Sequence, residues 1–380
     1  MQNFFDFDEA ERRKKDLDNR IENLQKDDRD VYIFGAGEYA KKLKKFLTSI
    51  GISVKGFFVD DCYAGEGIAP ISKIKEYRNF CLVFGVGGGF SQNYYEKIDF
   101  LKKKVEKCDN SVFFVLPSDY ILIKPGLLNV HHEIIDVDFL KNHFEEFKQT
   151  YEILEDALSK NVMSEYLYAS VCHDASKLEE LGSNWDHDYD LNLLFDKCGD
   201  GVVIECGAFD GKTITEISEF TKNKYEMMAL ECDDDNFEKC CKRVKDFPNI
   251  HIVKLGAWDK RAKLAIVQQD FASYLKEIDD SSEYENVVDV VNVDSLTSKR
   301  IAALIMDIEG SELKALKGAQ NAIKNGANLA IRVYHKKEDL ITIPQYIKSL
   351  NANYKFYIRF ERGTNFCRTG DETTLYAICE

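Results

Sequence analysis

The chain of 380 residues has little of several features that mark specialised classes of protein. Only five prolines occur and there is no Ser/Gly tract, so a disordered linker is not expected. No stretch of about 18 uncharged apolar residues is present, and the N-terminus lacks the basic region and apolar run of a signal peptide. We therefore expect a cytoplasmic protein without a transmembrane segment.

Basic residues are outnumbered by acidic ones. The chain has 51 Lys and Arg against 66 Asp and Glu, a net charge of -15. A sequence-independent nucleic-acid binder needs a basic face, so nucleic acid is not expected as a partner. The eleven cysteines are odd in number and lack a Cys-x-x-Cys pair. This pattern indicates reduced thiols rather than a disulfide framework or a zinc site.

The length and the hydrophobic content of 44% predict two globular cores. Apolar strands alternate with helices from Val31, and the pattern restarts at Gly199, which is typical of parallel sheets with right-handed crossovers. We predict an α/β protein in four segments: an N-terminal helix at 1–27, a small α/β domain at 28–125, a helical connector or cover at 126–198, and a larger α/β domain at 199–380.

The first helix is amphipathic, and its apolar face either packs on a neighbouring element or forms a homodimer contact. The strands expected in the small domain are Val31–Phe34, Val54–Val59, Cys81–Phe84 and Val112–Leu116. Those expected in the larger domain are Val202–Glu205, Glu226–Glu231, Ile250–Leu255, Ala302–Met306 and Leu329–Val333, followed by Tyr354–Phe360 and Thr374–Ile378 as a late antiparallel edge, with Lys263–Val267 as a possible β insertion.

A turn that follows the strand at Val202 predicts a nucleotide-like ligand. The strand runs into Glu205 and then into a loop with glycines at 207 and 211, which lets backbone approach a ligand closely. Glu231 ends the next apolar run about 20 residues further on, where a carboxylate can bind both hydroxyls of a ribose. Asp210 places an acid inside the loop, which favours a cationic nucleoside such as S-adenosylmethionine (SAM) over a pyrophosphate.

A second group of polar residues follows the fourth and fifth strands of this domain. Asp307 stands at the carboxyl end of the fourth strand, with Glu309 two residues later, and His335 follows the fifth. Ligands of open α/β sheets lie outside these strand ends, so the three side chains are expected at one edge of the cleft.

Four segments in this order resemble the FkbM family of SAM-dependent methyltransferases: Glu205–Gly211, Leu255–Asp259, Met306–Ala319 and Tyr334–Lys336. The resemblance implies a class I methyltransferase fold, with a mostly parallel sheet of seven strands, and methyl transfer to a hydroxyl of a sugar or polyketide. The N-terminal domain looks like the small Rossmann-like domain that precedes some FkbM regions. Two positions depart from the family near the acceptor side: Ile305 stands where members often have Lys, and Arg332 where many have Ser.

The resemblance also implies roles for individual residues. Glu205, Gly207, Asp210 and Gly211, with Ala208 in the same loop, would hold the methionine part of SAM; Glu231 would hold the ribose; and Ala257, Trp258 and Asp259 would lie near the adenine.

An acceptor hydroxyl is a poor nucleophile until its proton is being removed, so a base is expected, and the candidates are His335, Asp307 and Glu309. A divalent metal on Asp307 and Glu309 is possible but not favoured, because two carboxylates alone make a weak site. No residue is therefore assigned as a metal ligand.

The function that follows is methylation of a hydroxyl on a sugar or sugar conjugate, such as a nucleotide-linked or surface-polysaccharide precursor. One alternative is a nicotinamide-dependent oxidoreductase that uses the turn Gly35-x-Gly37-x-x-Ala40, which satisfies a dinucleotide pattern but leaves the second domain unexplained. The other is a non-catalytic ligand-binding protein on the same fold, against which the intact glycine loop and Glu231 argue.

Overall fold

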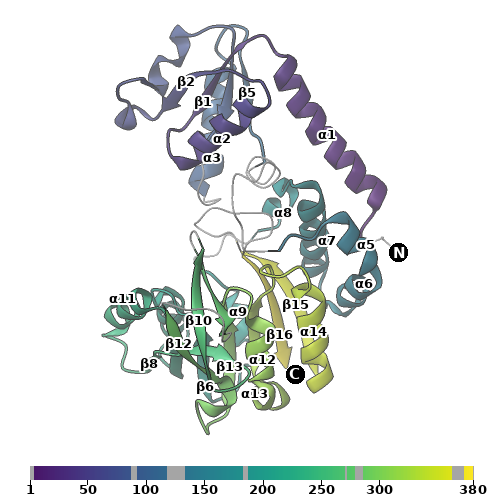
Figure 1. Cartoon of the computed structure of the whole chain (residues 1–380), viewed down its shortest axis with the longest axis vertical. Helices are drawn as coiled ribbons and strands as arrows, with labels where there is room; N and C mark the ends of the chain where they lie inside the picture. The colour runs from purple at the N-terminus through teal and green to yellow at the C-terminus, as the bar shows by residue number, and fades with distance from the viewer. Residues whose placement is uncertain are drawn as a thin grey trace. The chain divides into compact units, whose positions relative to one another are not determined.

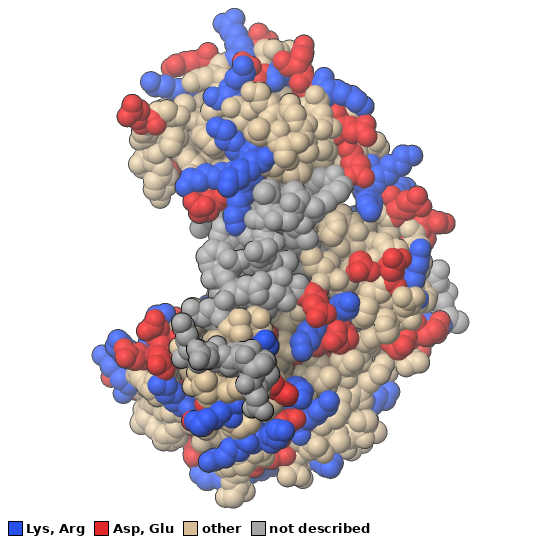
Figure 2. All heavy atoms as spheres, in the orientation of Figure 1, with Lys and Arg blue, Asp and Glu red and all other residues tan. Residues whose placement is uncertain are grey.

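The computed structural model describes residues 4–86, 92–117, 133–182, 187–269, 272–278, 286–361 and 372–379. The chain divides into two compact units, one of residues 1–130, 164–184 and 362–371, the other of residues 131–163, 185–361 and 372–380 (Figure 1). Among the described residues, no helix is long and apolar enough to cross a membrane. On the face drawn in Figure 2, basic and acidic side chains are interspersed over the surface of both units.

The first unit contains a parallel sheet of five strands in the order β3-β2-β1-β4-β5. Its elements are α1 (Phe7–Lys26), β1 (Asp30–Phe34), α2 (Glu38–Ser49), β2 (Val54–Val59), β3 (Ile68–Pro70), β4 (Phe80–Phe84), α3 (Gln92–Val105) and β5 (Val112–Phe114). The edge strand β3 was not predicted, because three residues are too short to show a periodic pattern.

The apolar face of α1 is buried within this unit. Leu17, Ile21 and Leu24 pack in one core with β1 and α2, on one side of the sheet. A second core, built by Phe58, Leu82 and neighbouring side chains, joins the sheet to α3. The burial of α1 therefore needs no contact with another copy of the chain.

The second unit contains a sheet of seven strands in the order β15-β16-β14-β13-β6-β7-β8. The strands are β6 (Val202–Cys206), β7 (Glu226–Leu230), β8 (Ile250–Val253), β13 (Ile301–Met306), β14 (Asn328–Arg332), β15 (Tyr354–Phe360) and β16 (Thr373–Cys379). β16 runs antiparallel to both of its neighbours, β14 and β15, and the other pairs are parallel. The predicted fold class, a mostly parallel sheet of seven strands after a smaller α/β domain, is confirmed.

The burial of these strands agrees with their places in the sheet. Every residue of β6, β13 and β14 is buried, as expected for strands covered on both faces. The edge strand β15 instead alternates between buried and partly exposed residues. The helices of this part are α9 (Leu191–Phe195), α10 (Lys212–Phe220), α11 (Asp234–Val244), α12 (Glu312–Lys317), α13 (Gln320–Lys324) and α14 (Asp339–Leu350), and the first three pack in one core with the sheet.

A smaller sheet is inserted after β8, in the order β11-β10-β12-β9. It consists of β9 (Gly256–Trp258), β10 (Ala262–Gln269), β11 (Ala272–Glu277) and β12 (Val287–Asn292). Of these four strands, the sequence predicted only β10, as the possible insertion at Lys263–Val267.

Helices dominate the segment predicted as a connector, of which residues 126–132 and 183–186 lie outside the described part. They are α5 (Val137–Asn142), α6 (Phe144–Ile153), α7 (Ala157–Cys172) and α8 (Ser176–Glu180), and the two units divide within α7. The Glu155 N–H donates to the Phe356 carbonyl, and Ser159 Oγ accepts from the Ile358 N–H. The start of α7 therefore covers the free edge of β15.

Candidate active site

Two loops at the carboxyl ends of β6 and β13 lie against each other. Gly207, just after β6, has φ +86°, and a Cβ built on it would be 1.9 Å from the Asp307 carbonyl oxygen. The Asp307 N–H donates to the Cys206 carbonyl at 3.1 Å. Glycine is therefore required at 207 for the packing of the two loops, before any ligand is considered.

A pocket opens at this edge, where β6, β7 and β13 end, and the inserted sheet forms one of its walls. It is lined by Gly207, Phe209, Leu230, Glu231, Cys232, Asp233, Asn236, Leu255, Gly256, Ala257, Ile266, Tyr274, Leu275, Asp307, Ile308 and Glu309. Of the residues predicted to bind SAM, Gly207, Glu231 and Ala257 are in this lining.

Glu231 fastens the glycine loop to the end of β7. Its Oε2 accepts from the Phe209 N–H and its Oε1 from the Asp233 N–H, both at 2.8 Å. Burial raises the pKa of Glu231 although these backbone hydrogen bonds oppose the shift. A carboxylate offers about four lone-pair positions, so the side chain can still accept hydrogen bonds from two hydroxyls.

Glu205 is buried at the end of β6, and its Oε2 has no hydrogen-bond partner among the described residues. Burial raises the pKa of Glu205 well above its usual value, and the charges of Asp307 and Glu231 act in the same direction. A buried carboxyl oxygen without a partner is costly unless a ligand satisfies it, so this position fits a cationic or hydrogen-bond-donating ligand.

Other predicted cofactor residues lie outside the pocket lining. Asp210 pairs with Arg243 and accepts from the Lys212 N–H. Trp258 packs in a small core of the inserted sheet, and Asp259 lies 3.7 Å from Lys314 Nζ.

Ala208 is buried, and its N–H donates to the Leu230 carbonyl at 3.0 Å. Gly211 precedes α10 with φ +81°, and a Cβ there would be 2.8 Å from Cys240 Sγ. Both residues therefore shape the loop through contacts within the protein, and their roles toward SAM stay predictions.

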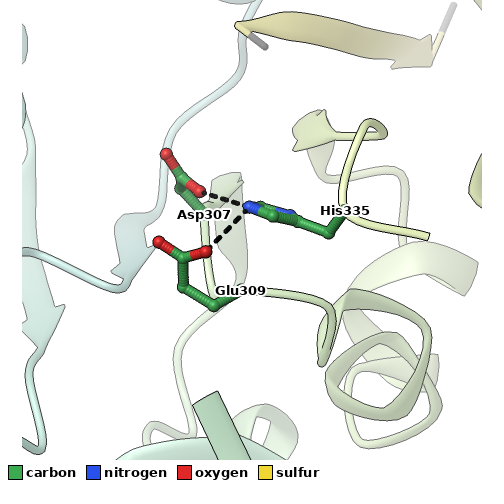
Figure 3. A group of neighbouring side chains, drawn as sticks. All are labelled: Asp307, Glu309 and His335. Carbon is green, nitrogen blue, oxygen red and sulfur yellow. Dashed lines mark ion pairs between the residues drawn. The ribbon is translucent and has the colours of Figure 1, made fainter. Parts of the chain in front are cut away.

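The structure brings the three predicted catalytic residues together (Figure 3). Asp307 and Glu309 come from the loop after β13 and His335 from the loop after β14, and the three side chains point toward one another. His335 Nε2 lies 3.5 Å from Asp307 Oδ1 and 3.3 Å from Glu309 Oε2. On its other side, His335 Nδ1 lies 2.9 Å from Oε1 of Glu312.

Charges dominate this cluster because His335 and Glu312 are buried, while Asp307 and Glu309 are only partly exposed. Burial would lower the pKa of His335, but Glu312 and Glu309 outweigh burial and raise it well above its usual value. Burial raises the pKa of Asp307, whereas His335 and Arg332 oppose that shift. A charged imidazole donates hydrogen bonds and accepts no proton, so only the neutral form of His335 can act as a base.

Three important residues were not predicted to belong to the site. Arg332 is buried, with Nε 3.6 Å from Asp307 Oδ2, and Glu312 is fully buried and accepts from the Ile308 N–H at 3.0 Å. Phe209 has a left-handed backbone conformation, with φ 48°, and its side chain is 62% exposed at the pocket. The only signal for Arg332 was its departure from the family pattern.

The strand order, with one antiparallel strand next to the edge, and the pocket beyond β6 and β7 define a class I methyltransferase fold. A family model described as "Methyltransferase FkbM domain" matches residues 205–356. Residues 205–356 therefore match an FkbM methyltransferase domain, as the four sequence segments predicted.

Solved structures extend the similarity beyond this domain. A methyltransferase FkbM from Methylobacillus flagellatus KT is 18% identical with a TM-score of 0.67, covering 97% of this chain and 98% of that one. This likeness shows a shared fold over nearly the whole chain. A putative rRNA-methylase from Clostridium thermocellum is 12% identical with a TM-score of 0.33, covering 50% of this chain and 91% of that one. No curated protein matches the chain.

Proposed function

We propose that the protein transfers the methyl group of SAM to a hydroxyl of a sugar or sugar conjugate. One observation carries the proposal: a single pocket joins Gly207 and Glu231 to Asp307 and Glu309, which lie in contact with His335. The first pair suits a nucleoside, and the second suits an acceptor that presents hydroxyls.

Two acids support SAM as the cofactor. Glu231 lines the pocket and has lone pairs that suit the ribose hydroxyls. Glu205 is buried at the end of β6, outside the pocket lining, and its unpartnered Oε2 suits the ammonium group of the methionine part. When bound, SAM supplies an electrophilic methyl group, and its sulfur is the leaving group.

The cluster after β13 and β14 supports a hydroxyl acceptor. Carboxylates accept hydrogen bonds from hydroxyls, and Asp307 and Glu309 can orient two of them on one polyhydroxylated molecule. Methyl transfer needs the attacking oxygen in line with the carbon–sulfur bond and a group that assists loss of its proton. The residues of this chain thus orient the acceptor and assist that proton loss.

The glycine turn of the first unit gives no comparable support for a nicotinamide cofactor. Gly35 has φ +117°, and a Cβ there would be 2.4 Å from the Gly85 carbonyl oxygen, so packing between β1 and β4 explains this glycine. Residues 87–91, which follow β4, lie outside the described part of the chain.

A binding experiment with Glu231 tests the proposal. In Glu231→Ala the Phe209 and Asp233 N–H groups lose their acceptor and the ribose loses its partner, so calorimetry should show SAM affinity reduced by more than about 10-fold. The control is Glu238→Ala, because Glu238 is an exposed acid of α11 that pairs only with Lys242 among the described contacts. Equal SAM affinity in folded Glu231→Ala and Glu238→Ala proteins would contradict this assignment of the pocket.

A further inference from the structure

We propose that Asp307, Glu309 and His335 bind a divalent metal ion whose remaining positions take the hydroxyls of the acceptor. This inference rests on the proposed function and deepens it, because it names the group that activates the acceptor. It also goes beyond the two-carboxylate site considered from the sequence, since the structure adds a histidine and a buried partner for that histidine.

The spacing of the donor atoms fits one ion. One ligand atom from each of Asp307, Glu309 and His335 lies within 4.8 Å of the other two. The imidazole Nε2 is 3.5 Å from Asp307 Oδ1 and 3.3 Å from Glu309 Oε2. Two donors that are each about 2.1 Å from an ion, in octahedral or tetrahedral geometry, lie about 3.0–3.4 Å apart. Only small side-chain adjustments are needed to place an ion among the three.

A carboxylate behind the histidine supports the same conclusion. Glu312 is fully buried, and its Oε1 lies 2.9 Å from His335 Nδ1 while also accepting from the Ile308 N–H. Metal-binding histidines almost always donate their second ring N–H to a carboxylate or carbonyl, which fixes the ring and the tautomer. Glu312 Oε1 is the carboxylate oxygen next to Nδ1 that can take this role for His335, while Nε2 is directed at the two carboxylates.

The surrounding charge also favours a cation. Glu205, with its unpartnered Oε2, is buried beside the cluster, and the charge of Asp307 acts on it. Arg332 Nε lies 3.6 Å from Asp307 Oδ2, but the Nη1 of the same guanidinium is already hydrogen-bonded to Glu361 and Thr374. Within this acidic setting a divalent ion would neutralise carboxylates that are now crowded around one imidazole.

The open side of the site faces the pocket. Asp307 and Glu309 both line it, so an ion held by three protein ligands would present its free positions where an acceptor can enter. Two carboxylates and one imidazole suit hard or borderline divalent cations such as Mg²⁺, Mn²⁺ or Zn²⁺.

The ion has a defined task in the reaction. It coordinates the acceptor hydroxyl and lowers the pKa of that hydroxyl, whose proton passes to solvent water. The oxygen then forms a bond to the methyl carbon of SAM while the carbon–sulfur bond breaks, and the electron pair of that bond goes to sulfur. The products are a methyl ether, S-adenosylhomocysteine and the released proton, so no redox partner is needed.

Metal binding can be measured without SAM or acceptor. The full-length protein, stripped with a chelator, is titrated with Mn²⁺ and followed by calorimetry and by loss of the free Mn²⁺ paramagnetic resonance signal. We expect one site per chain, with affinity reduced more than about 10-fold in Asp307→Asn and Glu309→Gln, and reduced about 10–100-fold in Glu312→Gln. Glu238→Gln, which removes one exposed acid from the same unit, should leave the affinity unchanged.

The inference would be overturned by a lack of saturable binding of Mn²⁺, Mg²⁺ or Zn²⁺, or by binding that Asp307→Asn and Glu309→Gln leave unaltered in variants whose melting temperature is retained. The side chains of Asp307 and Glu309 are both partly exposed, so neither variant leaves a fully buried site unfilled. Methylation that persists in a chelator would also overturn it while leaving the proposed function intact. Specific metal binding without any methyl transfer would instead support the metal site and contradict the proposed function.

Discussion

Gly207 shows at the scale of one residue that a glycine predicted for one reason can be required for another. The sequence placed a glycine there so that backbone could approach a ligand. The structure shows a loop contact as well, because a side chain at 207 would collide with the Asp307 carbonyl oxygen at 1.9 Å. Loss of SAM binding in a variant at 207 would therefore report the position of the loop after β13 as well as contact with SAM.

We predict that Gly207→Ala is destabilising as well as inactive. The positive φ and the collision with backbone oxygen should together cost about 2 kcal/mol or more, measured as the free energy of unfolding in urea. Gly37→Ala is the matched control, because a Cβ at 37 has nothing within 4 Å and its φ is -74°. A Gly207→Ala protein as stable as Gly37→Ala would contradict the packing explanation.

Individual residues also show which parts of the candidate site could be predicted from the sequence and which could not. Glu231, Asp307 and His335 could be assigned to the site because each closely follows an apolar strand, and such ends gather at one edge. The part played by Glu312 behind His335 depends on a contact between the start of α12 and the loop after β14. It leaves no pattern in the sequence.

At the scale of elements, the length of a strand and the burial of its residues decided whether it could be predicted. The strands β6, β13 and β14 are fully buried and each contains an apolar run, and they were predicted to within a residue at each end. In the inserted sheet, β9 has only three residues, and the first half of β12 is partly or fully exposed. Short or half-exposed strands lack the periodicity on which such predictions depend.

Arg332 joins the central sheet to the elements around it. From the end of β14, its Nη1 donates to Glu361 Oε2 at 2.6 Å and to Thr374 Oγ1, on β16, at 2.7 Å, and its Nη2 donates to the Asp188 carbonyl. The guanidinium also lies over the ring of Tyr189, 4.3 Å from its centroid. One side chain thus ties two strands of the sheet to the segment that precedes α9.

We predict that Arg332→Met is strongly destabilising. It would leave the buried Glu361 without its cation, a loss of about 3–5 kcal/mol in the free energy of unfolding. The double variant Arg332→Met/Glu361→Gln should recover part of that loss, because the uncompensated charge is gone. Lys299→Met provides the comparison, since its ion pair with Glu226 is exposed and worth at most about 1 kcal/mol. Equal losses in the two single variants would show that the buried network is not important for stability.

At the scale of the whole molecule, the two α/β units differ in what they offer a ligand. The second unit has a pocket with convergent acids and a histidine, whereas the described glycine turn of the first unit is explained by packing. The general fold of both could be predicted, because alternating strands and helices leave few topologies. The division of the chain within α7 could not be predicted, since it depends on which residues of that helix contact each unit.

The most direct test is methyl transfer by the full-length protein from SAM that carries a labelled methyl group. The acceptors are a panel of sugar nucleotides and lipid-linked sugars, and mass spectrometry follows the labelled product and S-adenosylhomocysteine. We predict labelled methyl ether on a hydroxyl of at least one acceptor, formed in equal amount with S-adenosylhomocysteine and abolished in Glu231→Ala. A melting temperature that rises with NAD(H) but not with SAM, together with no label transferred to any acceptor, would contradict the account.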